Sequence, residues 1–152
     1  MSEQADMLAL ERQVCFALAI ATRSVLAVYR PILEPLGLTH PQYLVMLALW
    51  GESPLSVKEL GALLQLDSPT LSPLLKRLEA AGLLTRRRRP DDERVLDVEL
   101  TGAGRALRAR AEKVPPAVIE RLGMDVPRLE ELHAALTEVI AAARAAGADA
   151  TV

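Results

Sequence analysis

Residues 56–100 read SVKELGALLQLDSPTLSPLLKRLEAAGLLTRRRRPDDERVLDVEL, and this stretch decides the fold. It begins with Ser56 and, three residues later, Glu59, which is the spacing of a capping box at the start of a helix. The apolar residues that follow recur at helical spacing and predict a short helix over Val57–Leu64. Residues Gln65–Asp67 are then expected to form a turn.

A second helix is predicted to begin at Ser68, whose hydroxyl suits an N-cap, with Pro69 in the first helical position. It runs to Ala81 and ends at Gly82, the residue type favoured just after a last turn. Pro73 removes one backbone hydrogen bond within it. Two helices joined by a three-residue turn are therefore expected.

The periodicity changes after this second helix. Apolar residues alternate with acidic ones over 96–100, which predicts a strand with one buried face. Leu83–Arg87 is the predicted partner strand, and Arg88–Asp92 is the polar turn that joins them. A helix, a turn, a second helix and a hairpin with a basic tip form a winged helix-turn-helix.

Helices are also predicted on the amino-terminal side of this segment. An amphipathic helix is expected from about Met7 to Tyr29, bent or ended by Pro31. Thr39 and Gln42 form a second capping box for a helix that runs to Trp50.

The carboxyl-terminal side is expected to be helical as well. Thr101 is the predicted cap of a long helix toward Val114, with Pro115 and Pro116 marking a kink or break. A last helix is predicted over Val126–Ala146. The fold class is therefore mainly α with a small β-hairpin wing.

The composition of the 152 residues, half of them apolar, fits one domain with a sizeable core. A single cysteine, Cys15, disfavours a disulfide scaffold, and no signal-peptide pattern is present, so the cytoplasm is the expected compartment. The longest apolar run, read as Tyr43–Trp50, is too short to span a membrane. One cysteine with His40 and His133 does not supply a metal site, and we expect no metal and no cofactor.

The charge is unevenly distributed along the chain. The formal net charge is -2, but residues 68–90 carry +5 and the remainder carries -7. A solvated charged face is the ordinary explanation of such a run. Because six basic residues fall on both the second helix and the wing, they favour DNA binding instead; they are Lys76, Arg77, Arg86, Arg87, Arg88 and Arg89.

The candidate DNA-binding residues lie on these two elements. Short hydroxyl side chains at the start of the second helix suit base edges or phosphates, long basic ones suit phosphates, and Arg94, oriented by Asp92, suits the minor groove. The full set is Ser68, Thr70, Ser72, Lys76, Arg77, Arg86, Arg88, Asp92 and Arg94. Two structural alternatives remain, namely that Ser68 serves only as a helix cap and that Arg77 pairs with an acid of its own domain.

Four motifs resemble the MarR family of bacterial winged-helix regulators: Ser56–Leu60, Leu74–Glu79, Gly82–Leu84 and Asp91–Arg94. Three further motifs are similar to those of the organic-hydroperoxide-resistance regulators (OhrR) within that family; they are Val14–Leu18, Tyr29–Pro31 and Pro41–Leu44. The resemblance covers nearly the whole chain. It implies a single MarR-like domain over 1–152, with a winged helix-turn-helix lobe at about 39–100 and dimerisation helices at about 7–36 and 102–146.

The resemblance also implies a function: a homodimeric repressor that binds pseudo-palindromic operator DNA until an organic hydroperoxide oxidises Cys15. Tyr29 would donate a hydrogen bond to the Cys15 thiolate from the partner chain. The family often has tyrosine where this chain has Ala19 and His40, so His40 and Arg23 are further candidates to support the thiolate. With no second cysteine, the oxidised sensor must pair with a low-molecular-weight thiol or oxidise further.

The sequence also allows other functions. A MarR-type repressor released by a small aromatic or phenolic ligand would need no cysteine oxidation. A thiol peroxidase would use Cys15 as its nucleophile, although an enzyme has no evident use for a basic helix and wing. A winged helix that binds only proteins, or a Cys15 that is merely a small core residue, are the remaining alternatives.

Overall fold

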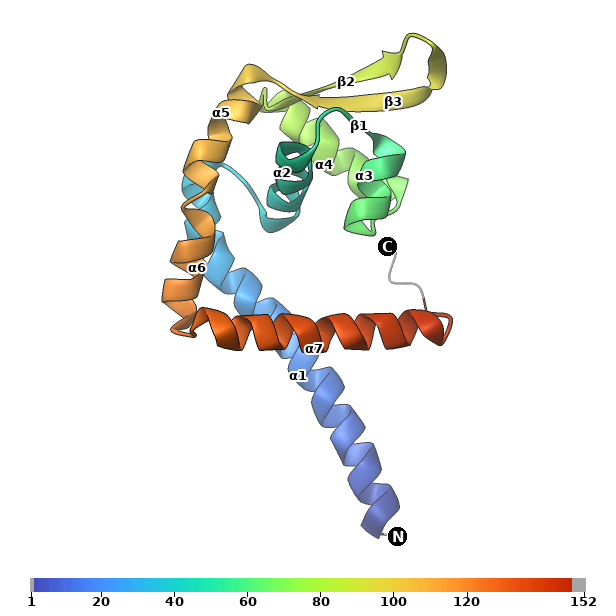
Figure 1. The fold of residues 1–152 in the computed structure, drawn as a ribbon, viewed down its shortest axis with the longest axis vertical. Helices are drawn as coiled ribbons and strands as arrows, with labels where there is room; N and C mark the ends of the chain where they lie inside the picture. Colours follow the sequence, from blue (N-terminus) through green and yellow to red (C-terminus); the bar gives the residue numbers. More distant parts are fainter. Residues whose placement is uncertain (1, 149–152) are drawn as a thin grey trace.

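The computed structural model describes residues 2–148, apart from the side chains of residues 2–8 and 10–12. Its elements run along the chain in the order seen in Figure 1. They are α1 (Ser2–Leu33), η1 (Glu34–Leu36), α2 (His40–Gly51), β1 (Leu55–Ser56), α3 (Val57–Leu64), α4 (Ser68–Ala80), β2 (Leu84–Arg89), β3 (Asp92–Leu100), α5 (Gly102–Ala111), α6 (Val114–Leu122) and α7 (Val126–Ala145). The mainly helical class with a small β wing is confirmed.

The elements from α2 to β3, residues 39–100, form one lobe, which we call the reading head. Its sheet has the order β1-β3-β2, and all its pairs are antiparallel. Leu84 pairs with Leu100, and Leu55 pairs with Val98, so the buried side chains of all three strands face the helices. Leucines of α3 and α4 complete this core; the most buried are Leu60, Leu71, Leu75 and Leu78. Burial of this apolar area is the main stabilising term for the lobe.

The predicted caps Thr39, Ser56 and Thr101 are confirmed, although only Thr39 forms the full capping box, and the predicted cap Ser68 is wrong. The Thr39–Gln42 capping box begins α2, and the Ser56 hydroxyl accepts the Glu59 N–H at the start of α3. At α4, however, the cap is Asp67, whose carboxylate accepts the Thr70 N–H at 2.9 Å. An aspartate caps as well as a serine, and here it stands one residue earlier than the cap that we predicted.

The wing is longer than predicted and has an additional strand beside it. Its strands extend to Arg89 and back from Asp92, so the turn shrinks to Pro90 and Asp91. The ladder continues past Arg87 because the Arg89 guanidinium binds the Asp97 carboxylate across the two strands, at 2.9 and 3.1 Å. The two-residue strand β1 was not predicted, because it is too short to show any alternation.

The amino-terminal helix α1 continues through Pro31, where we predicted an end or a bend. Proline removes one hydrogen bond of the ladder, and only the last two residues of the 32-residue helix follow it. Within α1 and η1, residues Gln13–Leu36 form a stretch of 24 residues that is long and apolar enough to cross a membrane, by length and composition only. The prediction that no stretch approaches the length of a membrane span is therefore wrong by length and composition, although Arg23 and Arg30 interrupt this stretch. In the single chain this stretch is mostly exposed.

Three helices lead away from the reading head as an arm. Thr101 caps α5 as predicted, and the predicted long helix breaks after Ala111, with Pro115 and Pro116 in the first turn of α6. Figure 1 shows α5 and α6 descending beside the head, and α7 crossing below it next to α1. Helix α6 packs against α1, so the arm and the amino-terminal helix meet there.

Candidate functional site

Helix α4 has a buried face and an exposed face. Leu71, Leu74, Leu75 and Leu78 anchor it in the core of the reading head. The predicted recognition residues on this helix are all exposed; they are Ser68, Thr70, Ser72, Lys76 and Arg77. The surface therefore has hydroxyl groups near the amino terminus of α4 and positive charges one to two turns later, an order that suits insertion of a helix amino terminus into a major groove.

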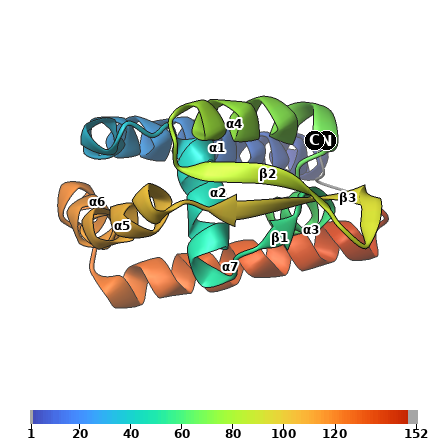
Figure 2. The same ribbon diagram turned by 90° about the horizontal axis from the view of Figure 1, so that it is seen from above.

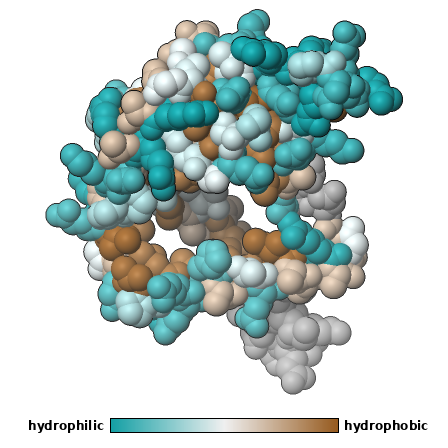
Figure 3. Space-filling model, turned by 45° about the horizontal axis from the view of Figure 1, so that its top comes forward, coloured by the Kyte–Doolittle hydropathy of each residue, from teal (hydrophilic) through white to brown (hydrophobic). Residues whose placement is uncertain are grey.

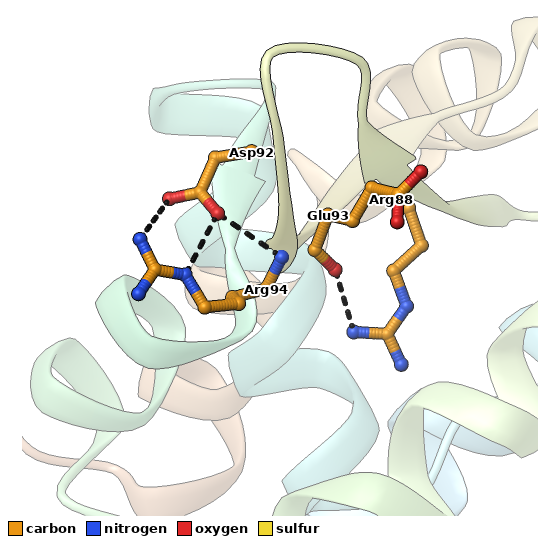
Figure 4. A network of polar contacts seen from close by, with 4 residues as sticks. All are labelled: Arg88, Asp92, Glu93 and Arg94. Carbon is orange, nitrogen blue, oxygen red and sulfur yellow. Dashed lines mark hydrogen bonds and ion pairs between the residues drawn. The ribbon is translucent and has the colours of Figure 1, made fainter.

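The tip of the wing carries an oriented arginine (Figure 4). The Asp92 carboxylate accepts hydrogen bonds from the backbone N–H and the Nε of Arg94, both at 3.1 Å. The Arg94 side chain is nevertheless 91% exposed. Asp92 therefore fixes the orientation of the Arg94 guanidinium, which remains in solvent. Arg88 is exposed too, and it donates to the Glu93 backbone carbonyl at 3.1 Å. The contact expected from the sequence between Asp92 and Arg94 is present.

Two other arginines of the wing are bound to acids of their own lobe. Arg86, one of the predicted DNA-binding residues, donates to the Glu79 carboxylate at 3.1 Å, and Arg89 binds Asp97. Glu79, near the end of α4, thus pairs with Arg86 on the wing and not with Arg77 on its own helix. Sequence reasoning did not identify these partners, because each pair joins two elements whose relative position is set only by the fold.

Electrostatic stabilisation accompanies these contacts. Hydrogen bonds from Arg86 and Arg94 hold the pKa values of the Glu79 and Asp92 carboxyls below their ordinary values, and the hydrogen bonds from Arg89 do the same for the pKa of Asp97. All three acids stay ionised at neutral pH. The wing therefore keeps its ion pairs at neutral pH. Arg87 and Arg88, which have no ion-pair partner among the described residues, are exposed to solvent, as are the acids Asp91 and Glu93.

A groove of about 760 Å³ runs between α3, the start of α4 and the wing. Its lining includes Ser68 and Arg94, which we predicted as DNA-binding residues, together with Lys58 and Arg89, which we did not. The lining also includes the acids Glu59 and Asp67, so the side chains that suit contacts to phosphates are Lys58 on one wall and the exposed Arg94 on the other. The only signal for Lys58 in the sequence was its charge next to a helix start.

The predicted redox residues are not brought together within one chain. Cys15 is exposed on α1, and Tyr29 lies 14 residues further along the same continuous helix. At 1.5 Å per residue, that separation is about 21 Å. Arg23, also exposed, lies eight residues from Cys15 along α1. A contact between Cys15 and Tyr29 therefore requires two chains.

An aromatic cluster surrounds Tyr29 where α1 meets α2. The rings of Tyr29 and His40 meet edge to face with centroids 4.9 Å apart, and Tyr43 lies 6.0 Å from Tyr29. Partial burial lowers the pKa of His40 below its ordinary value of 6.5, which favours the neutral imidazole at neutral pH. His40 also lines a pocket of about 510 Å³ with Leu26 and Arg30 of α1 and with residues of η1 and of the connection to α2. Of the two roles open for His40, the neutral hydrogen-bonding one fits this environment better than the cationic one.

The helices outside the reading head expose a large apolar surface. Figure 3 shows apolar residues gathered on the part of the molecule below the reading head, whereas the wing is hydrophilic. The residues on α1 and α7 that make up this surface are Val14, Phe16, Leu18, Ile20, Val126, Leu132, Val139 and Ile140. Many exposed large apolar side chains on two helices are typical of an interaction surface.

Comparisons with known proteins agree with this architecture. Residues 38–96 match the model of the MarR family. The chain is 38% identical to the organic hydroperoxide resistance transcriptional regulator of Bacillus subtilis (strain 168), over 92% of this chain and 97% of that protein. It is 47% identical to the HTH-type transcriptional regulator TtmR of Methylorubrum extorquens (strain PA1), over 78% of this chain and 61% of that protein.

Among solved structures, reduced AbfR bound to DNA superimposes with a TM-score of 0.74 at 34% identity, over 91% of this chain and 99% of that one. Overoxidised AbfR bound to DNA gives a TM-score of 0.73 at the same identity, over 90% of this chain and 98% of that one. These relatives are transcriptional regulators and not enzymes. Together with the winged reading head, they establish that the chain belongs to the MarR family of DNA-binding transcriptional regulators.

Proposed function

We propose that this protein is a homodimeric repressor in the bacterial cytoplasm that holds operator DNA until an organic hydroperoxide oxidises Cys15. The observation that carries the proposal is the position of Cys15 and Tyr29 on one continuous helix, about 21 Å apart, which makes their contact possible only between two chains. The motifs around both residues resemble those of hydroperoxide regulators. The similarity to the hydroperoxide resistance regulator of Bacillus subtilis supports the inducer class.

The dimer is formed by helices outside the reading head. In this proposal, residues 39–100 are the DNA-binding lobe, and residues 7–36 and 102–146 are dimerisation helices. The exposed apolar surface of α1 and α7 supports this division, because its contact with a second chain would remove it from water. An antiparallel crossing of two α1 helices would also bring Tyr29 of one chain toward Cys15 of the other. The two recognition helices would then read two halves of a pseudo-palindromic site.

The sensing chemistry begins with the Cys15 thiolate. Its sulfur attacks the distal oxygen of the hydroperoxide, forming an S–O bond and breaking the O–O bond. The departing alkoxide takes a proton from water, and Cys15 becomes a sulfenic acid. A hydrogen bond from Tyr29 of the partner chain stabilises the thiolate and so raises the fraction that can react. His40 supports the Tyr29 ring by edge-to-face contact.

The sulfenic acid then has two fates, because Cys15 is the one cysteine of the chain. A small thiol condenses with it to form a mixed disulfide and water, or further peroxide oxidises it to sulfinic and sulfonic acid. Overoxidised AbfR has been solved bound to DNA, so overoxidation and DNA binding coexist in that relative. We therefore assign release of DNA mainly to the mixed disulfide, which adds more bulk at a helix interface.

The arm provides a route from the interface to the reading head. The Thr101 hydroxyl donates to the Gly82 carbonyl at 2.6 Å, and the Thr101 N–H donates to the Leu83 carbonyl at 3.1 Å. The Trp50 indole N–H of α2 donates to the Gly104 carbonyl at 2.9 Å. The two bonds of Thr101 fix the start of α5 to the turn between α4 and β2, and the bond of Trp50 fixes it to α2. A displacement of the arm would thus move α4 and the wing with it.

The test uses mixed dimers that separate Cys15 from Tyr29. Tyr29→Phe should slow the loss of the Cys15 thiol on addition of cumene hydroperoxide by about tenfold, as expected for one hydrogen bond to a charged group. The Tyr29→Phe protein is then mixed with an excess of the Cys15→Ser protein, so that subunit exchange forms mixed dimers. In a mixed dimer the Tyr29→Phe chain carries Cys15 and its partner supplies Tyr29, so the rate of thiol loss should return to that of wild type. Thiol loss is followed by alkylation and mass spectrometry.

The matched control is exchange with excess chain that carries both Cys15→Ser and Tyr29→Phe, which should restore nothing. Equal rates with the two partners would contradict the contact across the dimer. If Tyr29→Phe had no effect in any dimer, Tyr29 would have no part in the chemistry of Cys15.

A further inference from the structure

Glu79 is the one acidic residue in the segment 68–90, and both of its carboxylate oxygens are occupied. Its Oε2 accepts the backbone N–H of Arg86 at 3.0 Å, and its Oε1 accepts the Nη2 of the same arginine at 3.1 Å. One side chain near the end of α4 therefore binds both the backbone and the side chain of strand β2.

This contact occupies the outer edge of the sheet. Strand β2 is at the edge of the order β1-β3-β2, with Arg86 paired to Val98 on its inner side. Figure 2 shows α4 running beside β2 along that edge. Because an edge strand has N–H groups without strand partners, the Glu79 carboxylate acts there as a substitute for a neighbouring strand. It thereby ties the recognition helix to the wing.

Arg86 itself is poorly placed for a phosphate. It is half-buried, with 23% of its side chain exposed, and its Nε is buried without a hydrogen-bond partner among the described residues. Arg94, in comparison, holds its guanidinium almost fully in solvent. The arginine nearest the base of the wing is thus engaged in holding the structure, and the arginine at the tip is available to DNA.

We propose that Glu79 is a positioning residue for DNA recognition, which sets the wing relative to α4 so that both engage one site together. The proposal rests on the DNA-binding role of the reading head. For a variant without the Glu79 carboxylate, the proposal predicts a change in DNA affinity opposite to the change expected from charge alone. Removing a carboxylate from a basic surface should tighten DNA binding by simple electrostatics. Loss of the clamp should weaken it, because α4 in the major groove and Arg94 in the next minor groove need a fixed separation.

The experiment compares Glu79→Gln with Glu93→Gln. Both variants remove one negative charge, but the Glu93 carboxylate has no ion-pair partner among the described residues. Two probes are used: a duplex enriched by the wild-type protein from a random library, and a scrambled duplex of the same composition. On the enriched duplex, Glu79→Gln should bind about tenfold more weakly than wild type, and Glu93→Gln should bind as tightly or more tightly.

On the scrambled duplex, both variants should bind at least as tightly as wild type. That result would also show that Glu79→Gln remains folded. A second comparison uses Arg94→Ala, since Glu79 acts by placing Arg94. Adding Glu79→Gln to Arg94→Ala should cost little further affinity for the enriched duplex.

Three outcomes would overturn the proposal. They are equal affinity of Glu79→Gln and Glu93→Gln for the enriched duplex, equal loss on the two duplexes, and full additivity with Arg94→Ala. A wild-type protein that enriches no duplex at all would instead contradict its DNA-binding role, so the two failures are distinguishable.

Discussion

Gly104 illustrates at the scale of one residue how the arm meets the reading head. It is buried in the first turn of α5, and an added Cβ would overlap the Leu83 carbonyl oxygen and touch the Leu100 side chain. Leu83 and Leu100 belong to the base of the wing, which is held on the other side by the core. Glycine is therefore required here by close approach of two backbones and not by its own dihedral angles.

Replacing Gly104 with alanine should destabilise the protein by about 1–3 kcal/mol, because a methyl group is forced into a packed contact. The measurement is the free energy of unfolding from urea denaturation. Gly102→Ala, two residues earlier, is the matched control, since nothing lies within 4 Å of its added Cβ. Equal stability of the two variants would contradict the close approach at Gly104.

Individual side chains were predicted from the sequence to different degrees. Asp92 and Arg94 are two residues apart, so their contact follows from local turn geometry, and the structure contains it. Arg86 was predicted to bind DNA from its charge alone, but its engagement with Glu79 depends on how β2 lies along α4. Asp67 replaced Ser68 as the cap because both are good caps in adjacent positions.

At the scale of elements, most helices are determined by local signals. Capping residues, helical periodicity and terminal glycines predicted α2, α3, α4 and α7 to within about one residue. Two features depended on other parts of the fold. Strand β1 exists only because β3 pairs with it, and the wing strands lengthen because Arg89 and Asp97 bind across them. Long-range pairing of this kind has no periodic signature in the sequence.

The wing and the aromatic cluster should respond to acid in two separate steps. The fold lowers the pKa of His40 by burial, so its neutral form contributes stability that is lost as the pH falls below 6.5. The fold also lowers the pKa values of Glu79, Asp92 and Asp97 through hydrogen bonds from arginines. Their contribution is complete above the ordinary pKa values of 4.5 for glutamate and 3.8 for aspartate, and it is lost as the pH falls through their lower pKa values in the folded state.

Urea denaturation across this pH range should therefore show an early and a late decline in the free energy of unfolding. His40→Gln should reduce the early decline, and Asp97→Asn should reduce the late one. If each variant kept the wild-type pH profile, the titration of these groups would not be coupled to folding.

At the scale of the whole molecule, one buried core extends from the reading head to the end of α1 and to α5 and α6, whereas much of α1 and α7 exposes apolar side chains. A charge placed on this surface should prevent association of two chains, because an unpaired charge in an apolar interface is costly. Leu132→Glu should shift the protein from a dimer toward the 16.5 kDa single chain in sedimentation experiments. It should also weaken binding to a two-half-site duplex, since each chain would then bind alone.

The matched control is Glu138→Lys, which changes a charge on the opposite face of α7 as counted by the helical repeat. This variant should remain dimeric. A monomeric wild-type protein, or a Leu132→Glu variant that still sediments as a dimer, would contradict the proposed interface.

The net charge of -2 is the sum of a basic segment and an acidic remainder. The basic excess is confined to residues 68–90, on α4 and the first strand of the wing, which carry +5, whereas the remainder of the chain carries -7. The location of these charges on α4 and the wing was predictable, because both elements have strong local signals. The relation of Cys15 to Tyr29 was expected only from the family resemblance, since it involves a second chain.

The most direct test of the central claim is DNA binding by wild type and Cys15→Ser, each with and without an organic hydroperoxide and a small thiol. Fluorescence anisotropy with the enriched duplex is a suitable readout. The account predicts that both proteins bind when reduced, that wild type releases the duplex after cumene hydroperoxide and thiol are added, and that Cys15→Ser stays bound. Release of Cys15→Ser by the same treatment, or a wild type that stays bound although Cys15 is oxidised, would contradict it.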